Sequence, residues 1–196
     1  MPIVVIIPVK SFRLGNQRLA DALDQQTRAR LGKALADHVA ATVSSVGLVP
    51  LVVTADPEVA EWSTRAGFPS LADPAQGLDA AASTGVQWAL HTRSSWIVLH
   101  SDLPLVGPSD IEALAGPVGE GGSVIAPSAD GGTSAIGSEA AVRFSFGASS
   151  FHRHLLRITT PRVVARTGLL LDIDSPRDLA AAMATGRGAW LEEALR

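Results

Sequence analysis

The sequence predicts one α/β domain built on a mostly parallel, doubly wound sheet with helices on both faces. Short aliphatic runs alternate with amphipathic segments through the first half of the chain, which is the order of repeated βα units. These runs are continuously apolar, as expected for strands that are covered on both faces. No internal repeat, low-complexity tract or linker divides the 196 residues, so we expect residues 1–196 to form a single domain.

The first half of the chain supplies most of the predicted sheet. Asp24 can cap a helix in which apolar side chains recur every four residues. Asp56 and Pro57 give a second helix its cap and first residue, and Ser109 is followed three residues later by a glutamate, which is capping-box spacing. Strands are expected at residues 3–7, 48–54, 69–71 and 96–99, and helices after Asp24, after Asp56, over residues 78–91 and from Ser109.

The second half of the chain has shorter apolar runs and more glycine in its loops. Strands are expected at residues 123–127, 143–146 and 169–174, and helices over residues 149–158 and from Ser175 to Met183. The strand at 169–174 is predicted because three consecutive leucines run into two acids, and a short apolar run of this kind is typical of a buried strand.

Composition excludes several classes of function. The formal net charge of -3 gives no basic field to attract nucleic acid, so no nucleic-acid partner is expected. The absence of cysteine excludes a disulfide framework, a thiolate nucleophile and cysteine-ligated zinc. No apolar run approaches the ~20 residues that span a bilayer. We therefore expect a soluble cytoplasmic protein with no membrane partner.

Three acids follow predicted strands. Asp102 comes after the apolar run at residues 96–99, and ligands of open parallel sheets bind beyond the carboxyl ends of the strands. Asp172 and Asp174 lie on one face of an extended segment because side chains alternate, which points Ile173 toward the core. The three carboxylates could therefore converge on a hard cation, for which Mg²⁺ is the best candidate. The alternatives are that Asp102 caps a turn and that Asp172 or Asp174 caps the helix at Ser175.

The loop after the first strand carries the opposite charge. Lys10, Arg13 and Arg18 lie where the phosphates of a nucleotide would sit in a doubly wound sheet. The loop has neither a G-x-G-x-x-G turn nor a Walker sequence, which argues against dinucleotide and P-loop binding. A solvated cationic loop is the simpler alternative. Cations that face a metal held by acids would neutralise the charge that develops during nucleotidyl transfer.

Six short segments occur in one order along nearly the whole chain. They are IPVK at 7–10 with Arg18 and Leu19, GLDAA at 77–81, SDLPL at 101–105, GTSA at 132–135, FGASSF at 146–151 with His154, and LDIDSP at 171–176 with Asp178 and Leu179. On these segments the chain resembles the 2-phospho-L-lactate/phosphoenolpyruvate guanylyltransferases of deazaflavin coenzyme biosynthesis, within the nucleotidyltransferases of GT-A-like fold.

The resemblance implies a reaction and a set of site residues. The phosphate of a small three-carbon acid attacks the α-phosphorus of GTP and releases pyrophosphate, and a homodimer is favoured. The implied residues are Asp102, Asp172 and Asp174 as Mg²⁺ ligands, Thr133, Gly147 and Ser150 for the phosphorylated acid, Lys10, Arg18, Gly77 and Asp79 for the nucleotide, and Lys10, Arg18 and Asp102 for catalysis.

Three positions depart from the family pattern. Asn16 stands where the family usually has a lysine, Asp79 where it commonly has asparagine, and Ser134 where it commonly has asparagine. Two other functions therefore stay open: a metal-dependent nucleotidyl- or glycosyltransferase with another acceptor, and a non-catalytic nucleotide-binding relative. Among the histidines, His100 is expected to be a satisfied structural residue at a strand end, and His154 to support the site from behind.

Overall fold

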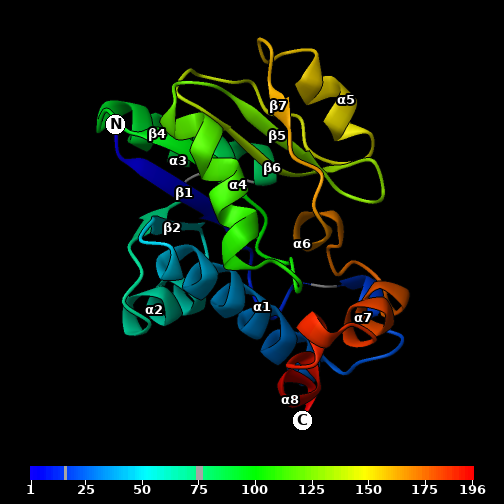
Figure 1. Ribbon diagram of the computed structural model, residues 1–196. Helices are drawn as coiled ribbons and strands as arrows, with labels where there is room; N and C mark the ends of the chain where they lie inside the picture. Colours follow the sequence, from blue (N-terminus) through cyan, green and yellow to red (C-terminus); the bar gives the residue numbers. More distant parts are fainter. Residues whose placement is uncertain (16, 74–76) are drawn as a thin grey trace.

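The computed structural model describes residues 1–15, 17–73 and 77–196 and is built on a seven-stranded sheet with the order β3-β2-β1-β4-β6-β5-β7 (Figure 1). The strands are β1 (Ile3–Pro8), β2 (Val49–Thr54), β3 (Ser70–Ala72), β4 (Ser95–Leu99), β5 (Val124–Pro127), β6 (Thr133–Ser138) and β7 (Arg162–Val163). All neighbouring strands pair in parallel except β6, which runs antiparallel to both β4 and β5. The predicted mostly parallel α/β sheet is confirmed.

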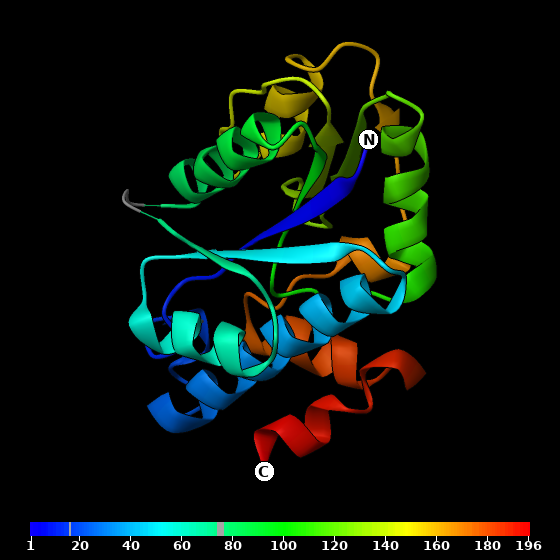
Figure 2. The ribbon, with the colours of Figure 1, turned by 90° about the vertical axis from the view of Figure 1, so that its left-hand side faces the viewer.

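Helices cover both faces of this sheet, as the sequence predicted. α3 packs on one face of β1, β2 and β4, while α1, α2 and α4 cover the other face (Figure 2). The helices are α1 (Gln25–Ser45), α2 (Pro57–Arg65), α3 (Leu78–His91), α4 (Pro108–Gly119), α5 (Ser150–Leu155), α6 (Thr167–Leu170), α7 (Pro176–Met183) and α8 (Leu191–Leu195), with short 3₁₀ turns η1 (Gln17–Leu19) and η2 (Gly186–Gly188). Among the described residues, no helix is both long and apolar enough to cross a membrane.

The central strand β1 shows why its sequence is continuously aliphatic. Val5 and Ile7 join the core on the side of α1 and α4, whereas Val4 and Ile6 join the core beneath α3. A strand buried on both faces has no position for a polar side chain. Gly85 lets α3 approach closely, because a Cβ atom at that position would lie 2.4 Å from Cγ2 of Ile6.

Helix caps confirm two of the sequence predictions and correct a third. The carboxylates of Asp24 and Asp56 accept hydrogen bonds from the N–H groups of Thr27 (2.8 Å) and Glu58 (2.8 Å) at the starts of α1 and α2. At α4 the N-cap is Gly107 rather than Ser109. The carboxylate of Asp110 accepts from the Gly107 N–H at 3.0 Å, so the helix begins with Pro108.

The second half of the chain contains the errors of the sequence prediction. Residues 143–146 are irregular and do not form a strand. The N–H groups of Ser145 and Phe146 donate to the side chains of His154 and Asp79 and not to a neighbouring strand. Residues 169–174 are not a strand either, because Leu169 and Leu170 belong to the short helix α6, Leu171 is its C-cap, and the two acids lie in an irregular segment. A short apolar run does not distinguish a strand from a buried helical turn. The helix predicted at 149–158 is the shorter α5.

A third core cluster attaches the C-terminal part of the chain to α1. Ile173 and Leu179 pack with Leu31 and Leu35 of α1, and Ile173 is fully buried, as its place between two acids predicted. Trp190 stacks on His38 at a ring-centroid distance of 4.7 Å and donates a hydrogen bond to the carbonyl of Pro104 (3.2 Å). The C-terminal segment thereby supports the loop that follows β4.

Candidate active site

The fold gathers polar residues at the edge of the sheet where β1 and β4 end. The antiparallel strand β6 begins at this same edge, since Leu99 pairs with Ala135 and the N–H of His100 donates to the carbonyl of Ser134 at 3.0 Å. Residues that are far apart in the sequence are therefore neighbours here, as expected at the carboxyl ends of parallel strands. Two groups of side chains meet at this edge, one acidic and one rich in hydroxyl groups.

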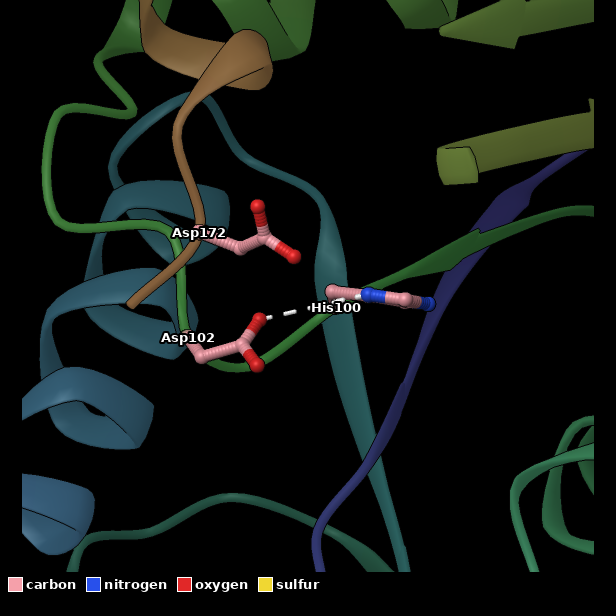
Figure 3. A group of neighbouring side chains, drawn as sticks. All are labelled: His100, Asp102 and Asp172. Atoms are coloured by element: carbon pink, nitrogen blue, oxygen red, sulfur yellow. Dashed lines mark ion pairs between the residues drawn. The ribbon is translucent and has the colours of Figure 1, made fainter. Parts of the chain in front are cut away.

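The acid cluster consists of His100, Asp102 and Asp172, which offer ligand atoms that all lie within 4.8 Å of one another (Figure 3). Nδ1 of His100 is 3.9 Å from Oδ1 of Asp102. The N–H of Ile173 donates to the carbonyl of Asp102 at 3.0 Å, which draws the segment after α6 against the loop after β4. This single backbone bond explains why Asp172 faces Asp102 although no strand is formed there.

The acids of this cluster are held in an unfavourable environment. Burial and the neighbouring charge of Asp174 raise the pKa of Asp102 to about 6, and burial together with the charge of Asp102 raises the pKa of Asp172 to about 6. Oδ1 of Asp102 and Nε2 of His100 are buried and have no hydrogen-bond partner among the described residues. Buried polar atoms normally have partners, so Oδ1 of Asp102 is an acceptor that a cation could satisfy, whereas Nε2 of His100 points away from both acids (Figure 3).

These donor atoms fit a divalent cation. Two carboxylates and one imidazole supply two hard oxygens and one nitrogen, a set that first-row divalent metals accept. A cation between them would satisfy the orphaned oxygen of Asp102 and reduce the repulsion between the two acids. The expectation that His100 is a satisfied structural histidine is wrong, because its Nε2 has no partner in the described part of the chain.

Asp174 lies apart from this cluster. Its Oδ2 accepts a hydrogen bond from the Arg18 guanidinium at 2.7 Å, while its charge still contributes to the raised pKa of Asp102. Lys10 is exposed at the end of β1, and its charge acts on both His100 and Asp102. Arg13 instead pairs with Glu58 of α2 at 2.8 Å. Two of the three cations of the first loop thus face the acids, and one faces away.

The hydroxyl network lies beside the acid cluster and links Thr133 of β6 to α5. Nδ1 of His154 lies 3.0 Å from Oγ1 of Thr133, and the hydroxyl of Ser150 donates to the same Thr133 oxygen at 3.2 Å. The N–H of Ser145 donates to Nε2 of His154 at 2.9 Å. Thr133, Ser150 and His154 are all buried. Burial lowers the pKa of His154 to about 4, and the positive charge of Arg157 contributes a smaller part of this shift.

The loop over residues 145–149 is fixed by side chains on both sides. Arg153 donates to the Ser145 hydroxyl (2.7 Å), to the Ser145 carbonyl (2.8 Å) and to the Ala148 carbonyl (2.6 Å). Gly147 has φ of +107°, a conformation that favours glycine, and Ser149 has φ of +56°. The N–H groups of Gly147, Ala148 and Ser149 donate to no other described residue. The loop therefore presents unpaired donors in a fixed arrangement.

The predicted nucleotide-binding residues of α3 lie next to this loop. Gly77 is the N-cap of α3 with φ of +100°, and Oδ1 of Asp79 accepts a hydrogen bond from the N–H of Phe146 at 2.8 Å. An asparagine at position 79 could accept the same bond through its side-chain oxygen, so the departure to Asp79 keeps this contact. Asn16, which departs from the family pattern in the loop after β1, lies outside the described residues.

Sequence reasoning identified most of this edge, including a supporting place for His154, but it did not assign His100 and Arg153 to the site. His100 is part of the acid cluster, His154 connects the hydroxyl network, and Arg153 holds the 145–149 loop. The proximity of His100 to Asp102 in the sequence was the available signal for the first of these. The roles of His154 and Arg153 depend on the irregular path of residues 143–149, which the expected strand at 143–146 obscured.

Comparison with known proteins identifies the family. The family model described as "Guanylyl transferase CofC like" matches residues 3–196. The chain belongs to the CofC-like guanylyl transferase family. A phosphoenolpyruvate guanylyltransferase from Rubrobacter xylanophilus is 37% identical over 196 residues, which cover 95% of this chain and 96% of the relative. A 2-phospho-L-lactate guanylyltransferase from Methanothermobacter thermautotrophicus is 29% identical and covers 100% of this chain and 91% of the relative.

Solved structures agree on the fold of this CofC-like chain. A protein from Desulfovibrio desulfuricans, assigned to the nucleotide-diphospho-sugar transferases, superposes with a TM-score of 0.77 over 98% of this chain and 95% of its own. The two sequences are 15% identical, so the likeness establishes a shared fold and nothing about the ligand. The resemblance inferred from the short sequence segments is confirmed by the family match.

Proposed function

We propose that this protein transfers the guanylyl group of GTP to the phosphate of a three-carbon phospho-acid, phosphoenolpyruvate or 2-phospho-L-lactate, and releases pyrophosphate. A phosphate oxygen of the acid forms a bond to the α-phosphorus, and the bond from that phosphorus to the bridging oxygen of pyrophosphate breaks. The proposal rests on the acid cluster and the hydroxyl network lying side by side at one edge of the sheet, joined by the bond from His100 to Ser134. The relatives' names supply the substrate pair.

The acid cluster is proposed to serve the nucleotide side of the reaction. Asp102 and Asp172 would hold the cation, for which Mg²⁺ remains the proposal because it prefers oxygen ligands, with His100 beside them and with Asp174 reaching the cation only by leaving Arg18. Bound there, Mg²⁺ would neutralise charge on the phosphates and withdraw electron density from the α-phosphorus. Lys10 and Arg18 are proposed to stabilise the triphosphate and the departing pyrophosphate, since both lie at this edge and their charges act on the acids.

The hydroxyl network and the 145–149 loop are proposed to hold the phospho-acid. Thr133 and Ser150 offer hydroxyl groups, and the loop around Gly147 offers N–H groups that donate to no other described residue. α5 has six residues, so the hydroxyls and the loop amides carry this proposal rather than a helix dipole. Gly77 and Asp79 lie beside the same loop, at the start of α3, and are proposed to border the nucleotide.

A product assay tests the proposed function. Purified protein with GTP, Mg²⁺ and each of phosphoenolpyruvate, 2-phospho-L-lactate and 3-phosphoglycerate should release pyrophosphate with at least one acid. Mass spectrometry should then show a guanylylated diphosphate product of the matching mass. Reactions with ATP, CTP and UTP serve as nucleotide controls. If a folded protein releases no pyrophosphate from GTP with any phospho-acid, the proposal is wrong; product formation only from another nucleotide would reassign the donor.

A further inference from the structure

The bonding of His154 fixes which of its nitrogen atoms carries the proton. A backbone N–H can only donate, so the 2.9 Å bond from Ser145 requires Nε2 of His154 to be an acceptor. In the neutral ring the proton is then on Nδ1, which faces Oγ1 of Thr133 at 3.0 Å. The ring therefore donates to Thr133, and its position is set from both sides.

The Thr133 hydroxyl can act toward a ligand only as a hydrogen-bond donor. Its oxygen accepts from Nδ1 of His154 and from the hydroxyl of Ser150, which uses both of its lone pairs. The Thr133 proton is thus directed elsewhere, and no described residue accepts it. Thr133 is 1% exposed, so this is a buried donor without a partner. A buried donor of this kind is stabilised by a ligand atom that can only accept.

We propose that His154 is a positioning residue that commits the Thr133 hydroxyl to donate to an anionic oxygen of the phospho-acid. The inference rests on the proposed function and extends it. His154 does not touch the substrate, but through Thr133 it would select a ligand oxygen that can only accept a hydrogen bond, as a carboxylate or phosphate oxygen does. A ligand that presents a hydroxyl proton toward Thr133 meets no free lone pair there. The same ring holds Ser145, so it also fixes the spacing between β6 and the 145–149 loop.

Two substitutions separate the two bonds of the ring. His154→Gln places an amide acceptor near the Nε2 position and removes the donor at Nδ1, whereas His154→Asn keeps a donor near Nδ1 and removes the acceptor. We expect His154→Gln to raise the KM for phosphoenolpyruvate at least about tenfold while the KM for GTP and kcat stay within about threefold. His154→Asn, which keeps the donor to Thr133, should raise the KM for phosphoenolpyruvate less than His154→Gln does, and it should lower the melting temperature because the bond from Ser145 is lost. The matched control is His152→Gln, an exposed histidine on the same helix.

A double-mutant cycle distinguishes positioning from a structural role. If His154 acts through the Thr133 hydroxyl, His154→Gln should add nothing to the rise in KM already caused by Thr133→Val. In the unliganded wild type, ¹⁵N-edited NMR should show a proton on Nδ1 and none on Nε2 of His154. An Nε2–H tautomer, additive losses in the cycle, or an unchanged KM for phosphoenolpyruvate in His154→Gln would each overturn the inference.

The failure of this inference is separable from failure of the proposed function. A wild-type protein that releases no pyrophosphate with any phospho-acid overturns the proposed function directly. An active wild type in which His154→Gln leaves the KM for phosphoenolpyruvate unmoved overturns the positioning role alone. The tautomer is measured without substrate, so that readout decides the state of the network in either case.

Discussion

The acid cluster and the hydroxyl network lie at one edge of the sheet but differ in how their polar atoms are satisfied. In the acid cluster, Oδ1 of Asp102 and Nε2 of His100 have no partner within the described chain, and the pKa values of Asp102 and Asp172 are raised to about 6. In the hydroxyl network, both nitrogens of His154 and the oxygen of Thr133 are already bonded. The first region is repulsive without a ligand, and the second is formed in advance.

This difference follows from the charge that each region would hold. A cation site needs negative charges brought together, and their repulsion is relieved only by the cation. An anion can be bound by neutral hydroxyl and N–H donors, which can bond to one another and to the chain before it arrives. Removal of one side chain should therefore stabilise the first region in the metal-free protein and destabilise the second.

The largest effect is expected from Asp102→Asn. Turnover should fall at least about 100-fold, because a neutral amide is a poor metal ligand. In metal-free buffer at neutral pH, the variant should be more stable than the wild type by about 1 kcal/mol, since one of two repelling, partly exposed acids is removed. Pyrophosphate release and denaturant unfolding measure the two effects. Unchanged turnover would remove Asp102 from the site.

The next effect is the pH dependence of folding stability that arises from His154. Its pKa falls from the ordinary value of 6.5 to about 4 on folding, so the unfolded chain binds more protons between these values. The stability contributed by the neutral ring is complete above pH 6.5 and is lost as pH falls toward 4, by about 2–3 kcal/mol. Denaturant unfolding of wild type and His154→Gln across this range should show a steeper acid loss in the wild type. Parallel curves would contradict the assigned shift.

The acids of the cluster should show the opposite sign. Because the pKa values of Asp102 and Asp172 are raised from 3.8 to about 6, the folded protein binds more protons than the unfolded chain between these values. Their repulsion is therefore relieved as pH falls through 6, and metal-free protein gains stability from this source. Mg²⁺ should raise the melting temperature at pH 7.5 and lose this effect below pH 6. A pH-independent Mg²⁺ shift, or the same shift in Asp102→Asn, would place the metal elsewhere.

The smallest effect on stability is expected at the exposed pair between Arg18 and Asp174. Its side chains are 75% and 48% exposed, so Arg18→Gln should change stability by less than about 0.5 kcal/mol. The same substitution should raise the KM for GTP by about tenfold if Arg18 serves the triphosphate. Arg65→Gln, which breaks an exposed pair on α2, is the matched control. An unaltered KM for GTP would contradict the assignment of Arg18 to the triphosphate, and Arg18 would then only hold Asp174 at the surface.

The two regions also differ in how far the sequence could predict them. Asp102 follows a regular buried strand, and the position of Ile173 between two acids predicted which face of its segment is buried. The sequence therefore predicted that Asp172 approaches Asp102, although the contact is made by the backbone bond from Ile173 to Asp102 and not by a strand. The exclusion of Asp174 from the cluster depends on its bond to Arg18, 156 residues away, which no local pattern reports.

The hydroxyl network was less predictable because irregular backbone builds it. Thr133, Gly147 and Ser150 were found through short segments shared with a family, not through periodicity. Their connection depends on Ser145 turning its N–H toward His154 and on the left-handed backbone of Gly147 and Ser149. Such paths are set by several long-range side-chain bonds at once, and Arg153 supplies three of them.

The attachment of the C-terminal segment to the loop after β4 has a consequence for synthesis of the protein. Asp102 leaves the ribosome about 70 residues before Asp172 and Ile173, whose N–H bonds to the Asp102 carbonyl, and about 90 residues before Trp190, which donates to the Pro104 carbonyl. Until those residues emerge, Leu31 and Leu35 have no cover from Ile173 and Leu179. The sheet can form on the nascent chain, but Asp102 and Asp172 come together only after the segment that carries Asp172 and Ile173 has been synthesised.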